Sequence, residues 1–235
     1  MARTQTIARD HVHGFITHAE KPIGGVLVLP TITGVDAPMK TLAEELAGAG
    51  ITAMVWDPFA EDTSNPTDLP GFMARAGKLR DDLVDTHMSA CLDHMLGELR
   101  LPAVAVLGFC LGGRHGLLLA AHDKRCAALV AFYPSVRVPM MPNQSRDAIA
   151  LAPQIACPVQ VIQAGADEVI LFPTFLKLRE ALETRTAATL SEVHPGAVHS
   201  FRRGDFQSDP ANAAATKISW PPALAFLKER LGAAA

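Results

Sequence analysis

The residues best suited to chemistry surround Cys110, in the stretch GFCLGG at positions 108–113. The stretch follows an apolar run and precedes a segment with helical spacing. Glycines on both sides of a nucleophile allow a tight turn between a strand and a helix, where larger side chains would collide. The turn raises the sulfur above a sheet and directs the next N–H, that of Leu111, at a developing oxyanion. The pattern predicts a thiol nucleophile; the alternative is a buried structural cysteine beside a glycine-rich packing contact.

A thiol nucleophile needs a base, and the base needs a group that orients it. In folds with this kind of turn, the order along the chain is nucleophile, acid, histidine. Asp167 lies in the loop just past the strand at 159–162, and His199 lies in a loop after the strand expected at 187–193. We therefore predict Asp167 as the orienting acid and His199 as the base.

Other residues compete for these two roles. Asp147 lies in an irregular segment with no strand before it, and Glu168 is expected to point away. His194 belongs to the end of a strand. Asp167 itself has an alternative interpretation as a helix cap or a turn residue, because aspartate is common in both places.

The elements that must position these residues alternate along the chain. Strands are expected at 4–8, 12–18, 25–30, 51–56, 103–109, 127–133, 159–164 and 187–193, and helices at 39–49, 73–99, 111–122, 172–184 and 211–231. We expect an interruption of the long helix at Gly77 and a break of the last one at Pro221 and Pro222. The pattern of residues 135–158 predicts neither a helix nor a strand. The segment either covers a pocket or is a long connection on the surface.

This alternation predicts an α/β protein with a mostly parallel central sheet and helices on both faces. Together with the turn at Cys110 it indicates an α/β-hydrolase fold, formed by one domain over residues 1–235. The length of 235 residues and the 49% hydrophobic content suffice for one well-buried core.

The composition argues against several classes of function. A net charge of −3 and the lack of a dense lysine and arginine run argue against a nucleic-acid surface. We expect no signal peptide and no membrane span, because the longest apolar run, 24–30, is too short. The four cysteines, Cys91, Cys110, Cys126 and Cys157, are scattered, which argues against a zinc site or disulfides and favours the cytoplasm.

Three segments together resemble the dienelactone hydrolase (carboxymethylenebutenolidase) family: FCLGG at 109–113, GAD at 165–167 and GAVHSF at 196–201. The strand at 25–29 and the following GVDAPM segment at 34–39 are also similar, so the resemblance covers nearly the whole chain. It implies a Cys-His-Asp triad at Cys110, His199 and Asp167. The combination is specific for the family and not for one substrate.

The resemblance further implies residues that bind the substrate. The backbone N–H groups of Ile32 and Leu111 would form the oxyanion hole. Arg203, four residues after His199, matches an arginine that clamps a carboxylate. A second family arginine is nearest to Arg75, with Arg80 as its competitor; Arg203 has the alternative of a solvent-exposed charge.

One position departs from the family pattern. Thr31 occupies the place of a glutamate that holds and helps to activate the thiol in the family. A threonine hydroxyl cannot repel an anion. The departure predicts a resting thiolate–imidazolium pair of Cys110 and His199, and a substrate that differs from dienelactone.

The leading hypothesis is a hydrolase without cofactor or metal that opens a small, carboxylate-bearing ester or lactone through an acyl-enzyme. Alternatives are a thioesterase and a non-catalytic binding protein that kept the fold. A redox-sensing cysteine would need a resolving partner, and strand spacing argues against contact between Cys110 and Cys126. The sequence leaves the oligomeric state and the natural substrate open.

Overall fold

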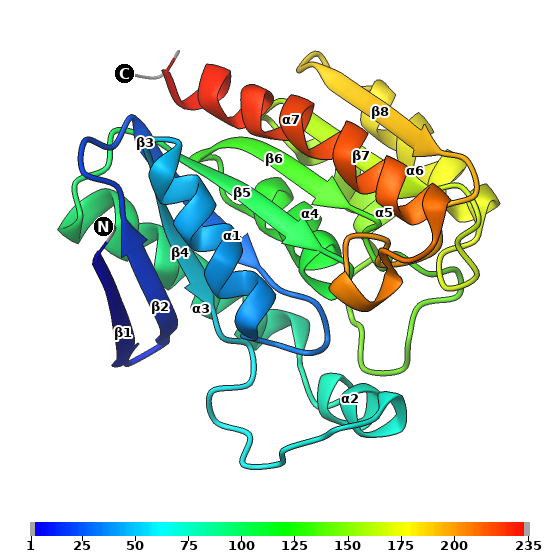
Figure 1. Ribbon diagram of the computed structural model, residues 1–235, viewed down its shortest axis with the longest axis horizontal. Coiled ribbons are helices and arrows are strands. Elements are labelled where there is room, and N and C mark those ends of the chain that lie inside the picture. The colour runs from blue at the N-terminus through cyan, green and yellow to red at the C-terminus, as the bar shows by residue number, and fades with distance from the viewer. Residues whose placement is uncertain (1–2, 233–235) are drawn as a thin grey trace.

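A computed structural model describes residues 3–232, which form one eight-stranded sheet flanked by helices (Figure 1). The strands are β1 (Arg3–Arg9), β2 (Val12–His18), β3 (Gly24–Leu29), β4 (Ile51–Trp56), β5 (Val104–Phe109), β6 (Cys126–Phe132), β7 (Val159–Ala164) and β8 (Thr189–His194). The α-helices are α1 (Ala37–Gly48), α2 (Leu69–Ala76), α3 (Asp81–Asp93), α4 (Leu111–His122), α5 (Ala148–Leu151), α6 (Phe172–Glu183) and α7 (Pro210–Gly232).

The strand order is β1-β2-β4-β3-β5-β6-β7-β8. Strands β1 and β2 form an antiparallel hairpin, and β2 pairs antiparallel with β4. All other neighbours pair in parallel. The mostly parallel sheet predicted from the alternation of elements is therefore confirmed. Parallel strands bring their carboxyl ends to one edge, where the loops that carry function gather.

Both faces of the sheet are covered, which explains why β3, β4, β5 and β7 are buried at every position and why β3 and β5 are apolar throughout. One core cluster joins α1 and α7 to the sheet, with Leu46, Phe109 and Phe226 among its buried side chains. The other joins α3, α4 and α6, with Met88 and Leu118 in it. In Figure 1, α1 and α7 lie in front of the sheet and α3, α4 and α6 behind it.

Two helix predictions can now be compared with the structure. The long helix expected at 73–99 is interrupted after Gly77, as predicted, but it also starts earlier, at Leu69, and ends in a π-helical turn, η1 (His94–Glu98). Asp68 caps α2, because its side chain accepts from the N–H of Gly71.

The break expected in the last helix is wrong, since α7 runs through Pro221 and Pro222. Both prolines are exposed. Because proline has no N–H, the carbonyl groups four residues earlier, those of Lys217 and Ile218, lack a helical donor. Lys217 and Ile218 are exposed as well. Water can therefore satisfy these carbonyls, and the buried residues on the opposite side of α7 keep it against the sheet.

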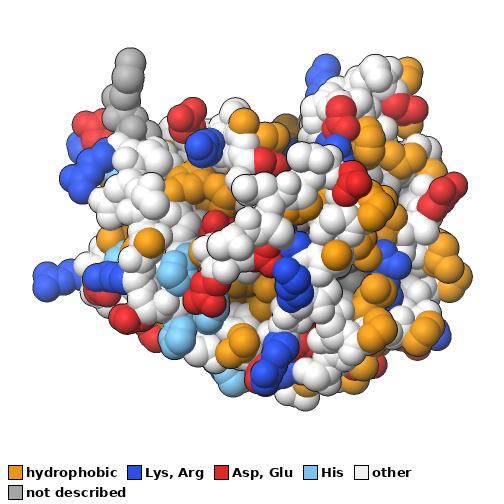
Figure 2. Space-filling model, turned by 90° about the horizontal axis from the view of Figure 1, so that it is seen from below, with side chains coloured by type: hydrophobic (Ala, Val, Ile, Leu, Met, Phe, Trp, Pro, Cys, Tyr) orange, Lys and Arg blue, Asp and Glu red, His pale blue; other side chains and the backbone are white. Residues whose placement is uncertain are grey.

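The segment 135–158, which the sequence left unassigned, contains α5 and a 3-10 turn, η2 (Ala152–Gln154). No helix among residues 3–232 is long and apolar enough to cross a membrane. On the face in Figure 2, acidic and basic side chains are interspersed, and histidines gather beside them on one side.

Candidate active site

Cys110 lies in the turn between β5 and α4, with a φ angle of 51°. Glycines permit this turn by close approach. A Cβ at Gly108 would lie 2.3 Å from the carbonyl oxygen of Gly112, and one at Gly112 would lie 2.1 Å from that of Leu29. A left-handed φ is unfavourable for a cysteine, so the packing around it imposes the conformation. The turn predicted at this position is confirmed.

The loop after β3 lies directly against this turn. The N–H of Gly112 donates to the carbonyl of Pro30 at 3.0 Å. Leu111 is the first residue of α4, where an N–H has no intrahelical acceptor. The N–H of Ile32 donates no hydrogen bond to any atom of residues 3–232. The two N–H groups named from the sequence thus belong to adjoining segments, the loop after β3 and the first turn of α4.

His199 and Asp167 meet at the same edge of the sheet. Nδ1 of His199 lies 2.8 Å from Oδ2 of Asp167. The loops after β7 and β8 are joined by a hydrogen bond from the N–H of Ala166 to the carbonyl of Ala197, 2.8 Å long. Asn212 on α7 also accepts from the N–H of Val198. These bonds fix the distance between acid and base.

The carboxylate of Asp167 is held on both oxygens. Oδ1 accepts from the N–H groups of Val169 and Ile170, at 2.8 and 2.7 Å. Oδ2 accepts from His199 and from Nε2 of Gln163, the latter at 3.3 Å. The side chain is 1% exposed. The carboxylate is thus both a turn residue, as the alternative interpretation had it, and the partner of the histidine.

The charged form of His199 is favoured. Burial of the ring disfavours it, but the hydrogen bond with Asp167 and the neighbouring Cys110 sulfur outweigh burial and raise the pKa of His199 to about 9. The Nε2 atom of His199 is buried and has no hydrogen-bond partner among residues 3–232. A cationic imidazole beside a sulfur can stabilise a thiolate and later deliver a proton.

The other residues considered from the sequence have different contacts or exposure. Asp147 caps α5 through the N–H groups of residues 149 and 150. Glu168 is exposed. His194 is the last residue of β8 and lies 3.4 Å from Glu192. Cys126 begins β6, at the sheet edge opposite to the one where Cys110 follows β5.

The arginines named from the family resemblance point to different partners. Nη2 of Arg75 donates to the carbonyls of Ile32 and Thr33, at 3.1 and 3.0 Å, and its guanidinium stacks on Phe59 at 3.9 Å. Its competitor Arg80 is exposed and pairs with an aspartate two residues on. Arg75 is therefore the arginine that reaches the loop after β3, and it holds that loop through two backbone carbonyls.

Arg203 is half-exposed and makes a bidentate pair with Asp205, at 3.0 and 2.7 Å. Thr31, at the position of the family glutamate, turns its hydroxyl toward that of Thr33, 2.8 Å away. The Thr33 hydroxyl donates to Asp36, the cap of α1. The threonine thus belongs to a hydroxyl chain that leads to α1.

Two residues of this region were missed from the sequence. Tyr133, the chain's single tyrosine, follows β6 with a φ angle of 37°, and its ring meets that of His199 edge-on at 5.3 Å. Burial raises the pKa of its hydroxyl. The other is Gln163, in the buried strand β7. Their signals were a lone aromatic at a strand end and a polar residue inside an apolar run.

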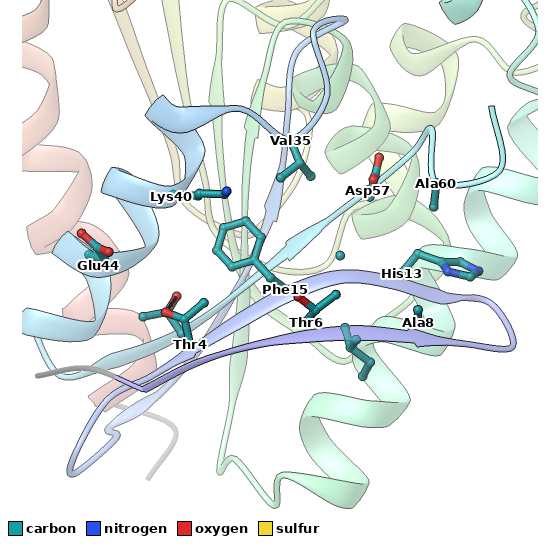
Figure 3. A pocket seen from close by; sticks show the side chains of 13 residues that line it. Thr4, Thr6, Ala8, His13, Phe15, Val35, Lys40, Glu44, Asp57 and Ala60 are labelled. Atoms are coloured by element: carbon teal, nitrogen blue, oxygen red, sulfur yellow. Dashed lines mark hydrogen bonds between the residues drawn. The ribbon is translucent and has the colours of Figure 1, made fainter. Parts of the chain in front are cut away.

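A cavity of about 530 Å³ lies between the β1–β2 hairpin and α1 (Figure 3). Phe15 lies near its centre, with Lys40 and Glu44 of α1 on one side and Thr4 and Thr6 of β1 on another. The catalytic candidates do not line it. Within residues 3–232, no group of three or more histidine, cysteine or acidic side chains could hold a metal ion.

Comparisons with known proteins show the family of the chain and its fold. The model of the dienelactone hydrolase family matches residues 12–231. Carboxymethylenebutenolidase from Rhodococcus opacus is 28% identical over 225 residues, which cover 91% of this chain and 85% of that protein.

Two solved structures show the fold. A dienelactone hydrolase-like promiscuous phosphotriesterase from metagenomic libraries has a TM-score of 0.78 at 21% identity, over 97% of this chain and 98% of that one. Dienelactone hydrolase from Anabaena variabilis has a TM-score of 0.66 at 18% identity, over 91% and 95%.

Proposed function

The chain belongs to the dienelactone hydrolase family and is a carboxylic-ester hydrolase, and we propose that it acts on a small lactone or ester through an acyl-enzyme on Cys110. The observation that carries the proposal is the 2.8 Å hydrogen bond between His199 and Asp167 beside the turn of Cys110. Asp167 orients the imidazole and stabilises its charged form.

In the first half of the reaction, the Cys110 thiolate attacks the carbonyl carbon, a C–S bond forms, and the carbonyl electron pair moves to oxygen. The N–H groups of Leu111 and Ile32 bind this oxyanion. The tetrahedral adduct then expels an alkoxide, which takes the proton from the His199 imidazolium. In a lactone the alcohol stays attached to the acyl chain.

In the second half, water loses a proton to the neutral imidazole of His199 and attacks the thioester carbon. The adduct collapses, the C–S bond breaks, and the carboxylic acid leaves. The proton on His199 then restores the thiolate–imidazolium pair. All steps use side chains and backbone groups of this chain and one water molecule.

Hydrolysis of p-nitrophenyl acetate by wild type and by Cys110→Ala tests the proposal. We expect the variant to lose ester hydrolysis while circular dichroism stays unchanged, because only a sulfur is removed from the turn. Mass spectrometry should detect an acyl adduct on Cys110 in the wild type. Undiminished turnover by Cys110→Ala would contradict the nucleophile.

We also propose that Arg203 selects anionic substrates, which rests on its place four residues after His199. A substrate carboxylate would replace Asp205 as its partner. Because Arg203 is 51% exposed, the gain lies at the low end for a charge-assisted hydrogen bond, and Arg203→Ala should raise KM for anionic esters about tenfold. KM for neutral esters should stay unchanged.

Arg80→Ala is a matched control, because Arg80 makes the same bidentate contact with an aspartate two residues on. It should leave KM unchanged for both kinds of ester. Equal effects of Arg203→Ala on anionic and neutral esters would remove Arg203 from substrate recognition.

A further inference from the structure

Gln163 is a fully buried amide on β7, in a strand that is otherwise apolar except for Gln160. Its Nε2 lies 3.3 Å from Oδ2 of Asp167 and 3.2 Å from the carbonyl oxygen of Ile170. Both neighbours only accept hydrogen bonds, so the NH2 side of the amide must face them. The direction of the amide therefore follows from the chemistry of its surroundings.

These contacts close a ring around the carboxylate. The amide binds Oδ2 of Asp167 and the carbonyl of Ile170, and the N–H of Ile170 binds Oδ1. Within residues 3–232, Oδ2 has only His199 and Gln163 as hydrogen-bond partners. Gln163 is thus the one group besides the imidazole that fixes the rotation of the carboxylate on the side of the base.

Gln163 is also a costly residue at this position. Its Oε1 is buried and has no hydrogen-bond partner among residues 3–232. A methionine would fill the same volume without an unpaired polar atom. A buried amide that is only half satisfied is a local disadvantage for folding, and such disadvantages are expected at functional sites.

We propose that Gln163 is a positioning residue, which holds the Asp167 carboxylate so that Oδ2 stays in line with Nδ1 of His199. The inference rests on the proposed function, because it needs His199 as the base. Gln163 acts through Asp167 and touches neither the substrate nor the sulfur.

The same strand supplies a matched control. Gln160 is also fully buried, and its Oε1 also lacks a partner within the described chain. Its Nε2 instead contacts Glu192 on β8. The same substitution at the two positions therefore changes burial and polarity alike, and only the one at Gln163 removes a contact with Asp167.

The first experiment compares Gln163→Met with Gln160→Met on p-nitrophenyl acetate, with circular dichroism to establish the folded fraction. We expect kcat to fall about tenfold in Gln163→Met with KM unchanged, since orientation of the base matters in the transition state. Gln160→Met should keep kcat within about twofold of the wild type. Equal kcat values in the two variants would overturn the proposal.

The second experiment uses glutamate, which can replace the N–H donor only when protonated. In Gln163→Glu, a protonated carboxyl would donate to Asp167, and an ionised one would repel it. The ratio of its kcat to that of the wild type should therefore fall as the pH rises from about 5 to about 8. The ratios for Gln163→Met and Gln160→Glu should stay flat, because neither gains a titrating group next to Asp167.

A ratio for Gln163→Glu that stays flat with pH would contradict the inference, because it would show that neither the lost donor nor a charge next to Asp167 affects the reaction. The proposed function fails in a different way, through activity of Cys110→Ala. If Cys110→Ala is inactive and Gln163→Met has the same kcat as Gln160→Met, the proposed hydrolase mechanism is retained and the positioning role of Gln163 is rejected.

Discussion

At the scale of single residues, three of the five non-glycine residues with a left-handed φ among residues 3–232 lie at the candidate active site. Cys110, Tyr133 and Ser200 have φ angles of 51°, 37° and 62°. Cys110 and Tyr133 each follow a strand, and Ser200 follows the histidine that Tyr133 contacts. Left-handed conformations cost free energy for residues other than glycine. Three such residues lie close to the hydrogen-bonded pair of His199 and Asp167. We infer that placing the sulfur and the imidazole lowers the free energy of unfolding of the protein.

The resting state of Cys110 can be measured by alkylation. Because the pKa of His199 is raised to about 9, its imidazolium persists through neutral pH, and we expect it to stabilise a thiolate beside it. We expect rapid reaction with iodoacetamide at a pH of about 6, where a free cysteine is almost wholly protonated. The rate should stay level as the pH rises and should increase again only near 9, when the imidazolium loses its proton.

Thr31→Glu is the variant that probes the departure from the family. Its carboxylate would repel a thiolate, so alkylation at a pH of about 6 should slow down. The other thiols give an internal control, since burial raises the pKa of Cys91 to about 12 and keeps it unreactive. A wild-type rate that follows an ordinary thiol titration, with no response to Thr31→Glu, would refute the ion pair.

At the scale of elements, α2 supports the loop after β3, which carries the proposed oxyanion donor Ile32, through Arg75. The guanidinium binds the carbonyls of Ile32 and Thr33 and stacks on Phe59. A hydrogen bond to a backbone carbonyl restrains the whole planar peptide unit. It therefore also restrains the direction of the neighbouring N–H groups. This geometry differs from a clamp on a substrate carboxylate, which the family resemblance implied for Arg75.

Arg75→Met distinguishes the two roles. If Arg75 positions the loop, kcat should fall roughly tenfold for neutral and anionic esters alike, because oxyanion contacts act in the transition state. KM should change little. A rise of KM confined to anionic esters would instead support a carboxylate clamp. Arg80→Met, four residues after the end of α2 and exposed, should affect neither constant.

The elements differ in how far the sequence predicts them. The strands buried on both faces and the turn at Cys110 were predictable, because apolar runs and close-packed glycines leave few alternatives. The continuity of α7 was not, since two prolines end a helix by local rules. Only the tertiary fold shows that they and the carbonyls they leave unpaired face solvent.

The site divides in the same way. Cys110, Asp167 and His199 follow from chain order and local spacing, and the structure brings His199 and Asp167 into contact. The direction of Arg75 and the bond from Gln163 depend on which side chains converge from distant segments. No local pattern contains that information, so these two contacts could be found only in three dimensions.

At the scale of the whole molecule, a buried ion pair joins the elements behind the sheet. Arg114 on α4 and Asp81 on α3 make a bidentate contact, at 2.7 and 2.9 Å, and both are at most 3% exposed. Asp81 also accepts from the N–H groups of Ser145 and Arg146. The pair thus ties α3, α4 and the segment before α5 together, and α4 begins directly after the proposed nucleophile, Cys110.

Arg114→Met should destabilise the protein by about 3–5 kcal/mol, because it leaves the Asp81 carboxylate buried without its cation. The double variant Arg114→Met with Asp81→Leu should recover most of the loss, since a well-packed apolar pair is often as stable as a buried ion pair. Urea unfolding at neutral pH measures both. A double variant no more stable than Arg114→Met would show that the backbone contacts of Asp81, and not its charge, hold these elements.

The pH dependence of the same variants gives an independent check. Burial opposes ionisation of Asp81, but its bonds with Arg114 and the backbone outweigh burial and lower the pKa of its carboxyl. A lowered pKa in the folded state stabilises the fold fully above the unfolded value of about 3.9, and this contribution disappears as the pH falls below it. The stability of the wild type relative to the double variant should therefore fall only under acid conditions. A difference between them that changes between pH values of about 6 and 8, where Asp81 does not titrate, would assign the effect to another group.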